Sequence, residues 1–200
     1  IYVGLNDGLE SFIYSNGQWI SEGRIPGLHE EVRTIVETKE SDLWLASAGM
    51  TARLKFPRKA NGEVDLQQPT IERFGNEHGL SSGWRYVYSL NDRLVLTTDS
   101  DGVFIYDEQS RRFLPDPTFD VSFSDGFRGV DILAEDSKGN VWFGSEQAGE
   151  VVVAVPQSDG EYEIEKTAFK NISKAAIVSI YTDPDGVVWF GGDGLFRYDS

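Results

Sequence analysis

The chain contains no cysteine, only two histidines and no long apolar run. Without thiols it cannot form disulfides, thiolate metal sites or a cysteine nucleophile. The lack of cysteine fits a periplasmic protein and a cytosolic one equally. His29 and His78 are too few for a multi-histidine metal site, and we predict neither a metal nor a cofactor. No apolar stretch is long enough to span a bilayer as a helix.

Basic residues are also scarce: 18 Lys and Arg stand against 33 Asp and Glu, which gives a formal net charge of −15. Such a surface repels the phosphates of nucleic acids and the headgroups of anionic lipids. We therefore expect no nucleic-acid partner and no direct membrane binding by this region. We interpret the acidity as a general surface property without a specific function, because negative charge keeps a β-protein soluble and discourages pairing of sheet edges.

What the chain does have is an internal repeat. Residues 136–144 and 183–191 both read Asp-x-x-Gly-x-x-Trp-Phe-Gly, and residues 38–46 are a degenerate copy. Two further copies, without a tryptophan, are centred on Tyr2 and Val95. Between equivalent positions the spacings are 42, 51, 47 and 47 residues, for Tyr2, Trp44, Val95, Trp142 and Trp189. This interval is typical of a four-stranded blade and predicts an all-β protein made of β-propeller blades.

Each copy is interpreted as four antiparallel strands. The first strands are short and rich in β-branched and aromatic residues, at 32–36, 86–88, 130–133 and 177–181. An Asp-x-x-Gly hairpin, the tryptophan strand and an Asp-Gly turn follow. A more polar outer strand closes the unit, as at 18–20, 70–74 and 162–165. We expect inner strands buried on both sides, because each blade packs between two others.

The ends of the chain fall inside repeats, whose approximate ranges are 1–27, 28–79, 80–126, 127–173 and 174–200. Three complete blades thus lie between two partial ones in a single propeller domain or fragment. A partial array of a larger, seven-bladed propeller is the preferred interpretation, and a four-bladed ring is the alternative. Exposed faces on the terminal blades of such a fragment would favour self-association.

Tryptophans at the repeat position are predicted to be structural, because they recur at one place in the blade. The structural set adds the turn residues and comprises Trp44, Trp142, Trp189, Asp136, Gly139, Asp183 and Gly186. Trp19 and Trp84 lie outside this register. They are the better candidates for exposed aromatic side chains with a function.

The pattern resembles the two-component regulator propeller repeat, most clearly at Gly126-Phe127 through Ser145 and at Asp183 through Asp199. The resemblance implies the periplasmic or extracellular sensor region of a bacterial inner-membrane signalling protein. Its ligand would be a glycan, another small molecule or a partner protein. A histidine kinase or diguanylate cyclase output domain would lie outside this chain, which is therefore predicted to be non-catalytic.

Glycine-led linkers carry the chain from one blade to the next and should reach the axial face. Residues beside them are the predicted ligand-binding set: His78, Trp84, Arg85, Phe127, Arg128 and Arg33. Arginines in so acidic a chain are suited to pair with a carboxylate or uronate, or with a carboxylate of a neighbouring blade. Trp84 is suited to stack on a sugar ring, or to cover its own blade.

Two other functions stay open. A propeller enzyme similar to streptogramin lyase would need a histidine base, yet neither His29 nor His78 has a paired carboxylate in its motif. No catalytic residue is predicted for this reason. A plain protein-interaction scaffold is the third possibility, because the propeller fold alone does not define a function.

Overall fold

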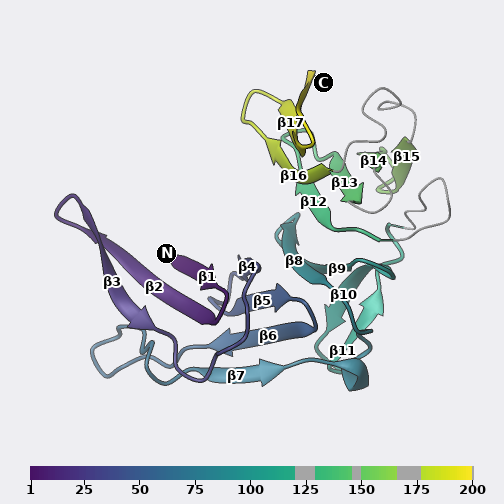
Figure 1. The fold of residues 1–200 in the computed structure, drawn as a ribbon. Coiled ribbons are helices and arrows are strands. Elements are labelled where there is room, and N and C mark those ends of the chain that lie inside the picture. Colours follow the sequence, from purple (N-terminus) through teal and green to yellow (C-terminus); the bar gives the residue numbers. More distant parts are fainter. Residues whose placement is uncertain (120–128, 146–149, 166–176, 200) are drawn as a thin grey trace. The chain divides into compact units, whose positions relative to one another are not determined.

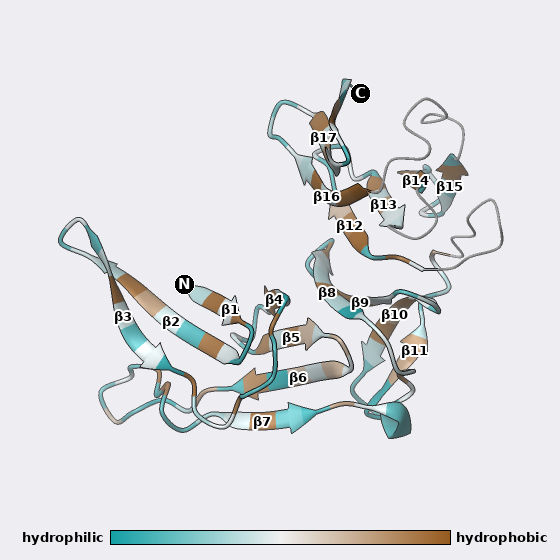
Figure 2. Cartoon of the chain, viewed as in Figure 1, coloured by the Kyte–Doolittle hydropathy of each residue, from teal (hydrophilic) through white to brown (hydrophobic). Residues whose placement is uncertain are grey.

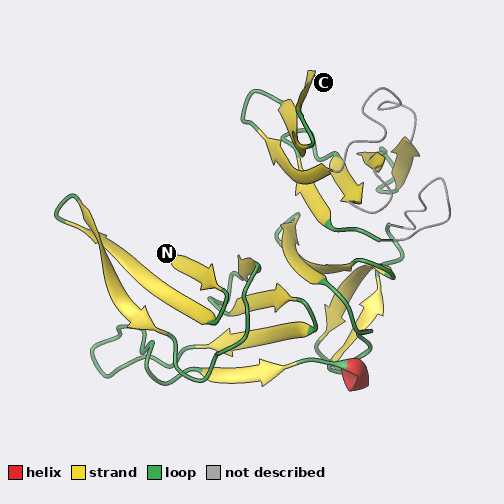
Figure 3. Ribbon diagram, viewed as in Figure 1, coloured by secondary structure: helices red, strands yellow, loops and turns green. Residues whose placement is uncertain are grey.

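The computed structural model describes residues 1–119, 129–145, 150–165 and 177–199. Within these ranges eighteen strands form five antiparallel sheets, and the helical content is one short 3₁₀ turn, Asn76–His78 (Figure 3). In the described part of the chain no helix is long and apolar enough to cross a membrane. The all-β prediction is confirmed.

The strands of each sheet follow one another in chain order (Figure 1). The first sheet contains β1 (Tyr2–Leu5), β2 (Gly8–Ser15) and β3 (Gln18–Arg24). The second contains β4 (Thr34–Glu37), β5 (Leu43–Ser47), β6 (Met50–Lys55) and β7 (Thr70–Arg73). The third contains β8 (Arg85–Leu90), β9 (Arg93–Thr98), β10 (Gly102–Asp107) and β11 (Arg112–Pro115). The fourth contains β12 (Ile132–Glu135), β13 (Val141–Ser145), β14 (Glu150–Pro156) and β15 (Tyr162–Glu165), and the fifth β16 (Ile177–Thr182), β17 (Val187–Gly192) and β18 (Leu195–Asp199).

Three four-stranded sheets thus stand between two three-stranded ones, as the repeat predicts. In the second and fourth sheets burial is greatest in the second strand and is lost in the outermost strand. All five residues of β5 and of β13 are buried, whereas β3, β7 and β15 have no buried residue. Apolar residues accordingly gather on strands, while the connecting turns are mostly hydrophilic (Figure 2). The exposed outer strands agree with the prediction, but the first strands are less buried than expected: β4 has no buried residue and β12 has one.

The chain divides into two compact units, Ile1–Val87 and Tyr88–Ser200, with the boundary inside β8. In the first unit, one buried cluster joins Leu9 of the first sheet to Leu45 of the second. In the second unit, one cluster joins Val95 of the third sheet to Phe143 of the fourth, and another joins the fourth sheet to the fifth. Consecutive sheets therefore pack face to face inside each unit, which is how propeller blades bury their strands.

The Asp-x-x-Gly turns are built by the aspartate side chains. Asp136 Oδ1 accepts hydrogen bonds from the backbone N–H groups of Lys138 and Asn140, at 2.9 and 3.0 Å. Asp183 Oδ1 does the same for two backbone N–H groups of its own turn. Gly139 and Gly186 have φ values of 81° and 87°, in the left-handed region that a residue without Cβ occupies at least cost.

Candidate functional site

Linkers and second turns meet at one end of each blade. In a meander of four antiparallel strands, the start of the first strand, the turn after the second and the end of the fourth lie at the same end. In the first unit these segments are residues 27–33, 47–49 and 73–84, which we call the linker face. The N–H of Gly49 donates to the Gly83 carbonyl over 2.7 Å, and Ser47 Oγ donates to Glu31 Oε2 over 2.8 Å. The turn is thereby tied to both linkers.

Arg33 and Trp84 lie together on this face. The guanidinium carbon of Arg33 lies 4.6 Å from the centroid of the Trp84 ring, a cation–π geometry. Arg33 Nε also donates to Glu31 Oε1 over 3.2 Å, while the side chain stays 53% exposed. Trp84 is half-buried. The structure thus brings together two predicted site residues that are 51 positions apart in the sequence, and it leaves the charged group of Arg33 accessible.

A hollow of about 240 Å³ opens on the linker face; Arg33 and Trp84 do not line it, but Glu31, which pairs with Arg33, does. Its lining residues are Glu30, Glu31, Ser47, Ala48, Gly49, Met50, Thr51, Arg73 and Phe74. Five of them have charged or hydroxylated side chains, and the sequence alone does not mark these residues as special, because each stands outside the repeat motif. The nearest signal was their place in the linkers and in the turn after the second strand.

Ion pairs fix the charge state of the hollow. Arg73 Nε donates to Glu30 Oε1 over 2.9 Å, and this contact lowers the pKa of Glu30 to about 2. The Ser47 hydroxyl and then Arg33 lower the pKa of Glu31 below its ordinary value. Both carboxylates are therefore ionised at neutral pH. A ligand on this face meets two paired carboxylates and the half-exposed Arg33.

Arg85, a third predicted site residue, is placed differently. It is 2% exposed, and its guanidinium donates to the backbone carbonyls of Ser81, Gly49 and Phe74. Burial lowers the pKa of this guanidinium. These contacts join the linker to the β5–β6 turn and to the end of β7. This geometry favours a structural role for Arg85, and the site proposed below omits it.

His78 makes its contacts within the linker itself. Its Nδ1 accepts a hydrogen bond from the Gly75 N–H over 3.1 Å, and its ring meets the edge of Phe74 at 5.1 Å between centroids. The same Nδ1 lies 3.1 Å from Glu77 Oε1. His78 does not line the hollow. The last two predicted residues, Phe127 and Arg128, lie outside the described residues.

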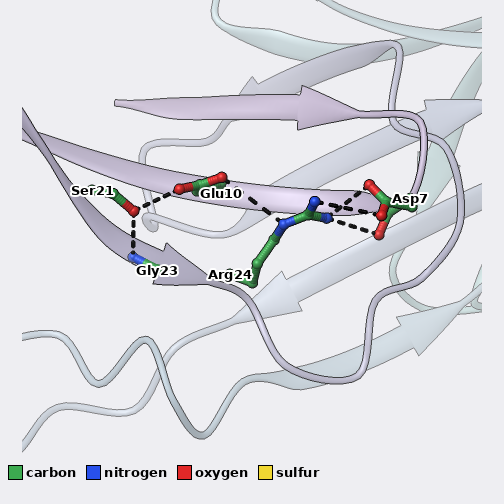
Figure 4. A network of polar contacts seen from close by, with 5 residues as sticks. All are labelled: Asp7, Glu10, Ser21, Gly23 and Arg24. Atoms are coloured by element: carbon green, nitrogen blue, oxygen red, sulfur yellow. Dashed lines mark hydrogen bonds and ion pairs between the residues drawn. The ribbon is translucent and has the colours of Figure 1, made fainter.

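The start of the first linker is anchored by a surface network around Arg24 (Figure 4). Arg24 Nη1 donates to Asp7 Oδ1 over 2.8 Å and to the Asp7 carbonyl over 3.1 Å. Ser21 Oγ in turn donates to Glu10 Oε1 over 2.5 Å and accepts from the Gly23 N–H over 3.0 Å. Such exposed pairs add little to stability, but they hold the end of β3 against the β1–β2 turn.

Within the described ranges, no three His, Asp or Glu side chains gather as a metal site would require. Arg33, Arg73 and Trp84 instead supply what an anionic or ring-shaped organic ligand needs: hydrogen-bond donors with positive charge, and an aromatic surface. The arrangement is therefore suited to binding an anionic ligand, whose main directional contact would be an ion pair with an arginine.

The model of the two-component regulator propeller family matches residues 171–194 of the chain. No curated protein sequence matches the chain. Among solved structures, it is similar to the extracellular domain of the hybrid two-component system BT4673 from B. thetaiotaomicron, with 20% identity and a TM-score of 0.60. That match covers 100% of this chain and 30% of the other.

Two enzymes share the fold as well. The periplasmic gluconolactonase PpgL of Pseudomonas aeruginosa is 18% identical, with a TM-score of 0.62 over 98% of this chain and 64% of its own. Virginiamycin B lyase of Staphylococcus aureus is 13% identical, with a TM-score of 0.57 over 96% of this chain and 63% of its own. At such identities the likeness establishes the propeller fold, which serves sensors and enzymes alike.

Proposed function

We propose that this chain is part of the extracytoplasmic sensor of a bacterial membrane signalling protein and binds its ligand at the linker face. The observation that carries the proposal is the half-exposed guanidinium of Arg33 on the ring of Trp84, beside a hollow of about 240 Å³. The regulator propeller repeat and the fold of the BT4673 extracellular domain support the sensor role.

The ligand class follows from the charges. Glu31 occupies only the Nε edge of Arg33, and in the described part of the chain no partner of its two Nη groups is found. Those groups are suited to a ligand carboxylate, because a guanidinium and a carboxylate form paired hydrogen bonds. We therefore favour an acidic glycan, such as a uronate-containing oligosaccharide, or a small carboxylic acid. A ring of such a ligand would lie along the exposed part of Trp84.

A thermal-shift screen of this chain tests the proposal. Oligogalacturonides, the matching neutral oligosaccharides and small carboxylic acids are titrated, and a ligand that binds the folded state raises Tm as its concentration rises. We expect a rise with one acidic class that Arg33→Gln abolishes and Trp84→Ala reduces. Arg24→Gln is the matched control, because Arg24 is as exposed as Arg33 but lies in the surface network around Asp7.

A rise that survives Arg33→Gln would place the ligand elsewhere. If the folded protein responds to none of these compounds, the proposal that the linker face binds a small acidic ligand is wrong. A protein-interaction scaffold would then be the better interpretation of the linker face.

A further inference from the structure

A second and larger hollow lies between the β2–β3 hairpin and the long β6–β7 loop of the first unit. Its volume is about 850 Å³, within the range of small-molecule sites. We call it the hairpin cleft; the side chains that the argument uses are Tyr14, Trp19, Glu22, Arg58, Lys59 and Glu63. None of these residues belongs to the repeat motif or to the linker face.

Exposed aromatic rings form one wall of the hairpin cleft. Trp19 is 55% exposed and Tyr14 is 59% exposed, and their ring centroids lie 5.0 Å apart with a tilt of 56°. Trp19 and Tyr14 face each other across the hairpin. Two large rings exposed to water do not contribute the stabilisation that their burial would give. A cluster of exposed rings is typical of a binding surface.

Charged groups of both signs line the same cleft. Ser11 Oγ donates to Glu22 Oε2 over 2.7 Å, and Arg58 Nη1 donates to the Gly62 carbonyl over 2.9 Å. Lys59 and Glu63 are joined through their backbones, since the Lys59 N–H donates to the Glu63 carbonyl over 2.8 Å. Among the residues that the structure describes, the ammonium of Lys59 and the carboxylate of Glu63 have no ion-pair partner. An unpaired positive and an unpaired negative group are thus held at the neck of one loop.

We propose that the hairpin cleft binds a short apolar peptide with free amino and carboxyl ends. Its carboxylate would pair with Lys59, its ammonium group with Glu63, and an apolar side chain would pack on Trp19. A ligand with a single charge satisfies only one of the two groups and is repelled by the other. The proposal concerns a second site and is independent of the function proposed for the linker face.

The backbone of β3 is unsuited to binding a peptide by strand addition, in which the peptide pairs with the edge of a sheet. Ser11 pairs with Gly23 and Phe12 pairs with Ser21, so Glu22 is an extra residue that forms a β-bulge. A bulge interrupts the row of N–H and C=O groups that strand addition requires. Recognition at the hairpin cleft must therefore come from the side chains and from the two charged ends of the peptide.

The dipeptide Leu-Phe is the probe, and its affinity for this chain is measured by isothermal titration calorimetry. We expect N-acetyl-Leu-Phe and Leu-Phe-amide, which each lack one terminal charge, to bind more weakly than the free dipeptide. Trp19→Ala should weaken binding by about tenfold, the upper end for one aromatic contact, and Lys59→Gln by several-fold. Ile20→Ala is the matched control, because Ile20 is 48% exposed on the same hairpin but does not line the cleft.

Equal binding of the free and blocked dipeptides, or an equal loss in Ile20→Ala and Trp19→Ala, would overturn the proposal. So would the absence of measurable binding by the folded wild-type chain. Arg33→Gln separates the two sites: it should leave the effects of Trp19→Ala and Lys59→Gln on dipeptide binding unchanged, and it should abolish the response to acidic ligands at the linker face.

Discussion

The second and fourth sheets hold the same repeat tryptophan in different ways. Trp44 of β5 and Trp142 of β13 occupy equivalent positions and are 2% and 1% exposed. Trp142 lies edge-on to Phe190 and Tyr198 of the next sheet, with centroids 5.7 and 5.3 Å away. Its Nε1 donates to Asp136 Oδ2 over 3.0 Å, so the Asp-x-x-Gly turn also anchors the indole.

Trp44 is covered by the strands of its own sheet and the residue that follows them. Phe74, directly after β7, stacks on it with centroids 5.1 Å apart, and the Arg53 guanidinium lies 5.3 Å from its ring centroid. Arg53 is held in turn by Asp42, at 2.6 Å. The turn before Trp44 has lost the consensus, with Thr38 and Ser41 in place of aspartate and glycine. Phe74 and Arg53 thus contact Trp44 from its own sheet, whereas Trp142 is held by the aspartate of its turn and by aromatic rings of the next sheet.

Replacing Trp142 with alanine should have the largest effect. The change removes a buried indole together with its contacts to the fifth sheet and to Asp136. We expect a loss of about 3–5 kcal/mol in the free energy of unfolding, from urea titration followed by circular dichroism. Trp189→Ala, at a half-buried equivalent, should cost clearly less. Equal losses would mean that burial by the next sheet is not what stabilises Trp142.

Removing Asp42 tests the internal support of Trp44. Asp42→Ala leaves Arg53, whose side chain is 11% exposed, without its main counter-charge and should cost about 3 kcal/mol. The double variant Asp42→Leu/Arg53→Met should recover part of that loss, because it removes both charges at once. The check is a double-variant cycle of unfolding free energies. A double variant that is no better than Asp42→Ala would show that the ion pair does not support the ring.

Asp136 gives the fourth sheet a dependence on pH. Burial alone would raise the pKa of Asp136, but hydrogen bonds from Trp142, Asn140 and the turn backbone outweigh burial and hold the pKa below its ordinary value. A carboxylate with a lowered pKa stabilises the fold above about pH 4, the unfolded value, and loses that contribution as the pH falls through the folded pKa. Asp136→Ala should cost about 1–3 kcal/mol at pH 7 and flatten the acid side of the stability profile. An unchanged acid limb in the variant would contradict this assignment.

The smallest expected effect lies at the degenerate turn of the second sheet. Ser41 has a φ of 64°, a region that strains residues with a Cβ atom. Ser41→Gly should therefore raise stability by up to about 1 kcal/mol, whereas Gly139→Ala at the matching place should lower it by about 1 kcal/mol. Thermal unfolding of the two variants beside the wild type provides the measurement. A gain in Ser41→Gly together with a loss in Gly139→Ala would support this difference between the two turns, and changes of the same sign would contradict it.

The fold was predictable because the repeat carries it. Short segments rich in β-branched and aromatic residues, the Asp-x-x-Gly turns and the spacing of equivalent positions predict the strands and their order, and the five sheets agree with them. The partners of Trp44 were not predictable, since Arg53 and Asp42 form a pair that only the register of β5 and β6 reveals. The same limit applies to Arg85. An arginine beside a linker suggests a ligand contact, and only the fold shows that its carbonyl acceptors lie in the segments 47–49 and 73–84.

The candidate site was predictable in part. Arg33 and Trp84 were picked out as an unusual cation and an aromatic outside the repeat register, and their contact needed the fold. The sequence does not single out Glu30 or Arg73 as site residues, because acidic residues are abundant and Arg73 ends an ordinary outer strand. The position of Trp19 outside the repeat register makes it a candidate for an exposed aromatic side chain, but the cleft that it lines depends on where the β6–β7 loop lies.

The central claim is that the linker face binds an acidic ligand through Arg33. Its most direct test is the affinity of Arg33→Gln for trigalacturonate, measured by calorimetry beside the wild type and Arg24→Gln. We predict a loss of about tenfold or more in Arg33→Gln, the scale of one charge-assisted hydrogen bond, and wild-type affinity in Arg24→Gln. Equal affinity in all three proteins, or an equal loss in both variants, would contradict the claim.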